Sequence, residues 1–143
     1  MDKITTVAVV DGQGGGIGSI IIEKLKSKVP NIKILALGTN ANATKSMLKA
    51  GANEGATGEN AIVYNAKEVD IIMGVVAILM PNSMMGELSP KMAEAIGGSH
   101  AMKILIPLSK CNIKIAIPGE YNIQQCIDSS VELVKDYISK LEQ

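Results

Sequence analysis

Short apolar runs alternate along the chain with longer stretches in which apolar residues recur every three or four positions. The short runs are rich in β-branched residues and are typical of strands buried on both faces, as parallel strands are. They cover residues 6–10, 32–37, 69–73 and 103–107. The periodic stretches predict helices over residues 17–29, 43–50 and 123–141.

Other segments give weaker or more local signals. Ser89 and Pro90 are typical of a helix start, and Gly97 and Gly98 are typical of its end. Residues 52–60 have the composition of a loop that could include a short strand, and a helical turn or two follows around residues 61–67.

The alternation of strands and helices predicts an α/β fold, a three-layer, doubly wound, Rossmann-like domain covering residues 1–143. We expect a mainly parallel sheet of about five strands. Residues 113–117 alternate like a strand and follow the run at 103–107 after only about five residues, too few for a parallel return. They are therefore predicted to form an antiparallel edge strand.

The composition narrows the classes of partner. Fourteen basic and fourteen acidic residues give a net charge of zero, which argues against nucleic acid as a partner. One histidine and two dispersed cysteines argue against a metal centre and favour a reducing, cytoplasmic setting. No apolar stretch is long enough for a membrane span.

A glycine-rich segment, Gly12 to Gly18, lies between the first predicted strand and the first helix. Glycines there let backbone N–H groups approach a ligand, and the helix start favours an anion. The segment therefore predicts a phosphate site. The alternative is that the glycines only permit a tight turn and close helix packing.

Gly12, Gly16 and Gly18 have a spacing that resembles the turn of the short-chain dehydrogenase/reductase family. The resemblance covers this turn alone and implies binding of NAD or NADP through its phosphates. The family's Tyr-x-x-x-Lys is absent, because Tyr64 and Lys67 are one residue too close. The candidate cofactor-binding residues are Gly12, Gln13, Gly14, Gly15, Gly16, Ile17, Gly18, Gly38, Thr39 and Asn40.

The choice between the two cofactors depends on the end of the second predicted strand. The acid that would hold the ribose of NAD is expected about 20 residues after the last glycine, where Gly38 stands. Thr39, Asn40 and Lys45 could instead contact a 2′-phosphate, although the chain has no arginine to clamp it. No G-K-[ST] follows the glycines, which argues against a P-loop NTPase.

Polar residues near the ends of the other predicted strands form a possible substrate or second-ligand site, because strand ends meet at one sheet edge. They are Asp11, Glu59, Asn60, Asn82, Ser83, Lys110 and Cys111. Each also has a structural interpretation: Asp11 could cap the N–H groups of the turn, and Asn40, Asn60 and Ser83 could be turn or cap residues. Glu87 is interpreted as a solvated charge.

Nearly the whole chain resembles an uncharacterised family of short bacterial proteins, a domain of unknown function. The resemblance implies a nucleotide-binding-like fold and no particular activity. The segments that carry it are residues 11–18, 38–40, 55–61, 82–84, 86–87 and 110–112.

Three functions remain open from the sequence. The first is an enzyme in which a dinucleotide such as NADP carries the hydride and loop residues orient a small substrate. The second is a non-catalytic nucleotide or redox sensor, or an accessory subunit. The third is a binder of a phosphorylated small metabolite. Met80, Met84 and Met85 could form an apolar patch for a homodimer.

Overall fold

The computed structural model describes residues 3–108 and 112–143, which form five strands, five α-helices and one short 3-10 helix. In chain order the elements are β1 (Thr5–Asp11), α1 (Gly16–Lys28), β2 (Ile32–Gly38), α2 (Ala41–Lys49), β3 (Glu54–Thr57), α3 (Glu59–Ala66), β4 (Ile71–Val75), η1 (Val76–Leu79), α4 (Pro90–Gly97), β5 (Met102–Ile106) and α5 (Ile123–Leu141).

The five strands form one parallel sheet in the order β3-β2-β1-β4-β5. This is the Rossmann order without a sixth strand. The chain reverses its direction of travel across the sheet between β3 and β4, so β1 and β4 become neighbours at the centre. The carboxyl ends of these two strands define the switch point, where folds of this class bind ligands.

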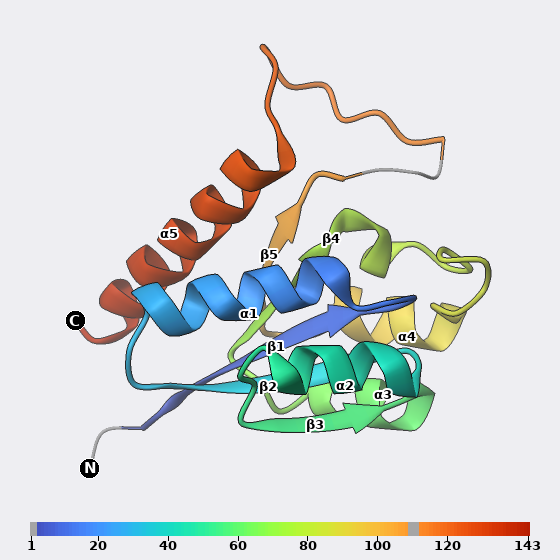
Figure 1. Cartoon of the computed structure of the whole chain (residues 1–143), viewed down its shortest axis with the longest axis horizontal. Coiled ribbons are helices and arrows are strands. Elements are labelled where there is room, and N and C mark those ends of the chain that lie inside the picture. The colour runs from blue at the N-terminus through green and yellow to red at the C-terminus, as the bar shows by residue number, and fades with distance from the viewer. Residues whose placement is uncertain (1–2, 109–111) are drawn as a thin grey trace.

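Helices cover both faces of the sheet (Figure 1). Helices α1, α2 and α5 lie on one face, where α1 contacts both of the others, and α3 and α4 pack together on the opposite face. The predicted three-layer, doubly wound architecture is confirmed. None of the helices in the described part of the chain is long and apolar enough to span a membrane.

The core is aliphatic and lies on both faces of the central strands. Val7 to Val10 of β1 are almost fully buried, as are Ile71 to Met73 of β4. This complete burial explains why both strands read as continuous apolar runs rather than alternating ones. Ile21, Ile22 and Leu25 of α1 cover the sheet from one side, and Ile62 of α3 covers it from the other.

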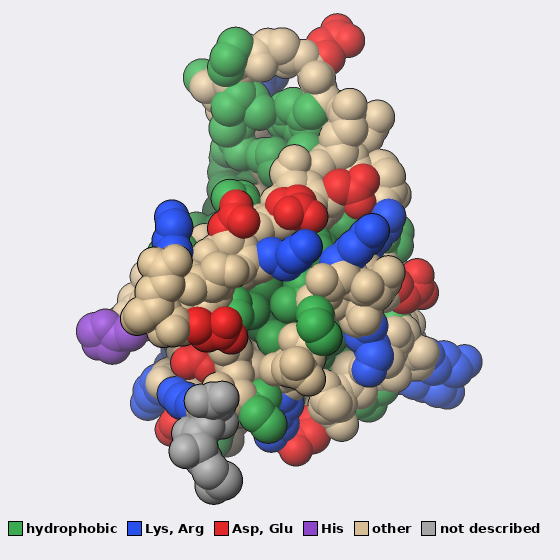
Figure 2. Space-filling model, turned by 90° about the vertical axis from the view of Figure 1, so that its left-hand side faces the viewer, with side chains coloured by type: hydrophobic (Ala, Val, Ile, Leu, Met, Phe, Trp, Pro, Cys, Tyr) green, Lys and Arg blue, Asp and Glu red, His purple; other side chains and the backbone are tan. Residues whose placement is uncertain are grey.

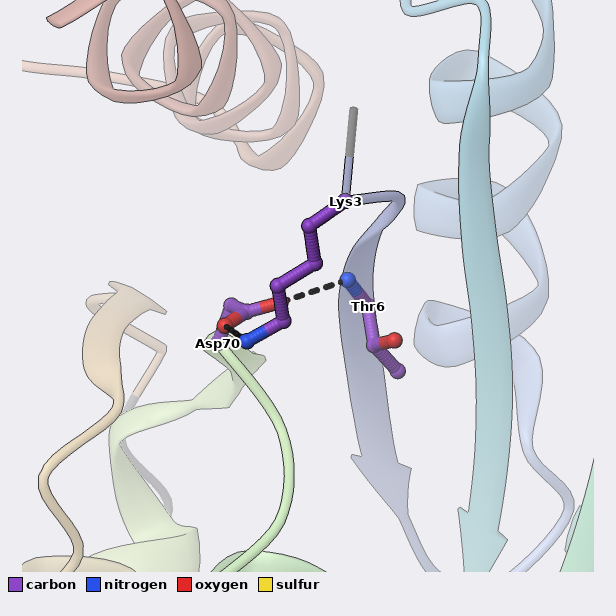
Figure 3. Close-up of polar contacts among 3 residues, drawn as sticks. All are labelled: Lys3, Thr6 and Asp70. Atoms are coloured by element: carbon purple, nitrogen blue, oxygen red, sulfur yellow. Dashed lines mark hydrogen bonds and ion pairs between the residues drawn. The ribbon is translucent and has the colours of Figure 1, made fainter. Parts of the chain in front are cut away.

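Asp70 links the amino ends of β1 and β4, at the opposite end of these strands from the switch point (Figure 3). The Asp70 carboxylate accepts a hydrogen bond from the Thr6 N–H at 2.8 Å and lies 3.5 Å from the Lys3 ammonium. The Asp70 N–H in turn donates to the Thr6 carbonyl at 3.0 Å. These contacts fix the register of the two central strands.

The predicted antiparallel edge strand is wrong. Residues 113–117 form no strand, and the edge of the sheet is β5, which pairs parallel to β4. Ile113 and Ile115 are half-buried while Lys114 and Ala116 are exposed, so the alternation is real. It reflects an extended arm with one side partly shielded from solvent, although residues 113–117 belong to no strand.

Candidate functional site

The switch point contains a small pocket at the carboxyl ends of β1 and β4. Its volume is about 150 Å³, and most of its lining is apolar. The lining residues come from the end of β1, the glycine segment, the end of β4, η1, the loop after η1 and the chain after β5: Asp11, Gly12, Gln13, Ile17, Val75, Ala77, Met84 and Leu108. The fold therefore places the glycine segment beside a pocket.

Asp11 ends β1 and holds the turn in shape. Its two carboxylate oxygens accept the N–H groups of Gly12 at 2.8 Å and of Gly18 at 2.6 Å. Burial raises the pKa of Asp11 above its ordinary value of 3.8; the two hydrogen bonds oppose this shift, and the nearby charge of Glu87 adds to it. Asp11 thus caps N–H groups of the turn, the structural interpretation considered for it.

Three glycines of the segment are required by the protein's own packing. A Cβ on Gly12 would lie 2.6 Å from the Thr39 hydroxyl, and a Cβ on Gly18 would lie 2.6 Å from the Met47 sulfur. Gly15 has a φ of 72°, and a Cβ there would meet the backbone of Ala43 at 2.8 Å. At these positions the packing explanation is sufficient.

Gly14 and Gly16 are different, because a Cβ at either position would have no atom within 4 Å. Both are exposed, and neither has the positive φ that favours glycine. Among the described residues, the N–H groups of Gly14, Gly16 and Ile17 find no acceptor. The glycine segment and the first turn of α1 therefore expose N–H donors that have no partner in the described part of the chain, with open space around Gly14 and Gly16.

The end of β2 contributes Gly38, Thr39 and Asn40 to the same edge. Gly38 serves packing, because a Cβ there would lie 2.6 Å from the Thr44 backbone nitrogen. Asn40 caps α2 by accepting the Ala43 N–H at 2.9 Å, and its amide group donates to the Gln13 carbonyl at 3.0 Å. This cap ties the start of α2 to the glycine segment.

Glu87 reaches this group from the loop between η1 and α4. Its Oε1 accepts hydrogen bonds from the Thr39 hydroxyl at 2.6 Å, the Asn40 amide at 3.0 Å and the Gln13 N–H at 3.0 Å. Sequence reasoning interpreted Glu87 as a solvated charge, and that interpretation is wrong. The partners lie 47 to 74 residues away along the chain, so no local pattern could predict the contact.

The hydrogen bonds to Glu87 should make the stability of the protein depend on pH. The bonds from Gln13 and Thr39, with a smaller one from Asn40, hold the pKa of Glu87 below its ordinary value of 4.5. Its contribution to stability is therefore present above pH 4.5 and is lost as the pH falls through the lower folded value. Urea unfolding of wild type and Glu87→Gln between pH 7 and pH 3 measures this contribution. We expect the difference between the two proteins to shrink with acid, and a constant difference would refute this assignment.

The other predicted site residues differ in burial and in their hydrogen-bond partners. Glu59 starts α3 and accepts the Ser89 hydroxyl at 2.6 Å, while Asn60 beside it is exposed. Ser83 is buried and donates to the Ala77 carbonyl at 2.6 Å, which ties the loop to η1. Asn82 is exposed, with a φ of 66°. Lys110 and Cys111 lie outside the described residues.

The three methionines expected to form an exposed patch do not behave alike. Met85 is 97% exposed, whereas Met84 is half-buried and lines the pocket, and Met80 is also half-buried. Another apolar surface lies elsewhere. Figure 2 shows hydrophobic side chains gathered at the end of the molecule where the arm meets α5. A groove of about 390 Å³ there is lined in part by Leu105, Ile117, Tyr121 and Leu133.

The sequence profile of the family described as "Domain of unknown function (DUF3842)" matches residues 6–139. The chain belongs to this family. The DUF3842 match includes the glycine segment, the end of β2 and the loop that carries Glu87, so the whole site lies within the family's domain. Comparison with curated proteins gives no match.

Among solved structures, the dodecameric FMN-dependent UbiX-like decarboxylase from Escherichia coli O157:H7 matches this DUF3842 domain with 10% sequence identity. The match covers 95% of each chain with a TM-score of 0.45. A likeness at this level does not extend to ligand or activity.

Proposed function

We propose that this protein binds a nucleotide of the NAD(P) type, with its phosphates on the glycine segment and its reactive end in the crevice between β1 and β4. The observation that carries the proposal is the pair of open glycines. Gly14 and Gly16 have room for a side chain and need no unusual backbone angle, so the fold itself does not require glycine there. A ligand that closely approaches the backbone does require it.

The free donors have the chemistry that a phosphate needs. The N–H groups of Gly14, Gly16 and Ile17 lack acceptors among the described residues, and the last two belong to the first turn of α1. The helix macrodipole adds a partial positive charge at this point, and no carboxylate accepts from these three groups. A phosphate supplies enough oxygens to accept from each of these groups.

The crevice beside these donors suits the uncharged part of a nucleotide. Ile17, Val75, Ala77 and Met84 give it an apolar lining next to the turn. Its volume of about 150 Å³ can hold part of a ring, and the rest of the nucleotide would lie open to solvent. A nicotinamide cofactor bound here would supply hydride transfer, while the chain would orient it and exclude water from one side.

The test compares valine substitutions at two exposed glycines, Gly16 in the glycine segment and Gly97 in α4. We expect Gly16→Val to weaken the binding of ADP, NAD and NADP by about tenfold or more, because the side chain would cover donors that the phosphate needs. The melting temperature without ligand should stay the same, because nothing lies within 4 Å of the new Cβ. Isothermal titration calorimetry and thermal shift measure the two effects.

Gly97→Val is the matched control, since Gly97 is exposed near the end of α4 and a Cβ there would only touch Leu79 at 3.8 Å. It should leave binding unchanged. Wild-type protein that binds sugar phosphates but none of the three nucleotides would contradict the proposed function. The same applies to nucleotide binding that survives Gly16→Val.

A further inference from the structure

We propose that Glu87 recognises the ribose of the bound nucleotide, accepting a hydrogen bond from its 2′-hydroxyl, so that the site takes a nucleotide with a free 2′-hydroxyl and rejects one with a 2′-phosphate. This inference rests on the proposed function and specifies its ligand. It assigns a specificity-determining role to a residue far in sequence from the glycine segment.

The carboxylate of Glu87 lies where a dinucleotide fold needs an acid. In Rossmann folds the ribose is held by an acidic residue at the end of the second strand. Here β2 ends in Gly38, followed by Thr39 and Asn40, with no acid. The Glu87 Oε1 lies 2.6 Å from the Thr39 hydroxyl and 3.0 Å from the Asn40 amide, so the loop brings the missing charge to this point.

The loop holds this carboxylate firmly. Leu88, the next residue, is fully buried in the core. Its carbonyl accepts the Asn82 N–H at 2.8 Å, and its N–H donates to the Ser83 carbonyl at 3.2 Å, closing a short antiparallel bridge. Ser89 then donates to Glu59 at 2.6 Å. The backbone on either side of Glu87 is therefore anchored, which restricts the position of its carboxylate.

One oxygen of the carboxylate remains available to a ligand. All three hydrogen bonds from Thr39, Asn40 and Gln13 go to Oε1, and Oε2 accepts none among the described residues. The phosphate donors at Gly14, Gly16 and Ile17 are also left free by Glu87. Glu87 takes one N–H group of the glycine segment, that of Gln13, and leaves these three donors to a phosphate, so the arrangement favours ribose recognition over blockage.

The same charge opposes a 2′-phosphate. An ionised carboxylate at the ribose position would repel the second anion. All 14 basic residues of the chain are lysines, so no arginine can clamp such a phosphate bidentately. In the earlier alternative, Thr39, Asn40 and Lys45 bind the 2′-phosphate of NADP. It is disfavoured because the Thr39 and Asn40 side chains already donate to Glu87, which leaves only the exposed Lys45 for the phosphate.

The experiment compares wild type and Glu87→Gln. Isothermal titration calorimetry measures the affinity of each protein for two pairs of ligands, ADP with 2′-deoxy-ADP and NAD with NADP. Wild type should bind ADP about tenfold more tightly than 2′-deoxy-ADP, and NAD about tenfold more tightly than NADP. In Glu87→Gln both ratios should fall towards one, because ADP and NAD would bind more weakly and NADP, no longer repelled, would bind more tightly. Glu94→Gln, on the exposed side of α4, is the control and should keep the wild-type ratios.

The outcomes separate this inference from the proposed function. Wild type that binds ADP through Gly16 but shows the same two ratios as Glu87→Gln would overturn the ribose role and leave nucleotide binding standing. Tighter binding of every nucleotide by Glu87→Gln would identify Glu87 as a blocking group and also overturn it. A folded wild-type protein that binds no nucleotide would overturn both.

Discussion

Replacing Leu88 by alanine is expected to lower the free energy of unfolding by about 2–5 kcal/mol, the usual range for a buried leucine. Leu88 is fully buried although it belongs to a loop, and its backbone makes the hydrogen bonds that close the loop on Asn82 and Ser83. The cavity would open at the residue next to Glu87 in the chain. Urea unfolding followed by circular dichroism measures the loss.

Leu133→Ala is the matched control for this change. Leu133 is 55% exposed on α5, so its truncation should alter the free energy of unfolding by only about 0.5 kcal/mol or less. Equal losses for the two variants would mean that the loop is not anchored through Leu88. Where Leu88→Ala remains folded, nucleotide binding should also weaken, because Glu87 would no longer be held beside Thr39 and Asn40.

The fold could be predicted because each buried strand leaves a strong local mark. β1 and β4 are covered on both faces and therefore consist of consecutive apolar residues, and the ends of α4 carry a capping serine, a proline and glycines. The arm at residues 113–117 was mispredicted for the converse reason. Its alternating pattern reports which side chains are half-buried, but it cannot report whether a strand is available for pairing.

The candidate site was only partly predictable. The glycine segment and the end of β2 are local features, and both lie at the edge where they were expected. Glu87 depends on a loop with unusual backbone angles, since Asn82, Met84, Met85 and Gly86 all have positive φ. Propensity does not predict such a path. The signal that could have directed attention to Glu87 was its place in a segment, Gly86-Glu87, that carried the family resemblance.

The glycine segment also combines three requirements that its sequence cannot separate. A run of glycines is the same whether each is needed for the turn, for packing or for a ligand. The structure separates them, because the space around each Cβ position differs: Gly12, Gly15 and Gly18 are crowded, whereas Gly14 and Gly16 are open. This division makes opposite predictions for neighbouring residues of one turn.

Gly18→Val should therefore destabilise the protein, by about 3 kcal/mol, at the upper end of the range for overpacking a core. The new Cβ would lie 2.6 Å from the Met47 sulfur and 2.9 Å from the Asp11 carboxylate, and both residues are buried. Moving Asp11 would also break its 2.6 Å hydrogen bond with the Gly18 N–H. Urea unfolding measures the loss.

Gly16→Val, two residues earlier in the same helix turn, is the reference for this experiment. It should change the free energy of unfolding by about 0.5 kcal/mol or less, because its Cβ enters open space. The two variants should thus have different effects: Gly18→Val lowers the free energy of unfolding, whereas Gly16→Val weakens only nucleotide binding. Similar losses of stability in both would show that the whole segment serves packing, and Gly14 and Gly16 would then give no support to a phosphate ligand.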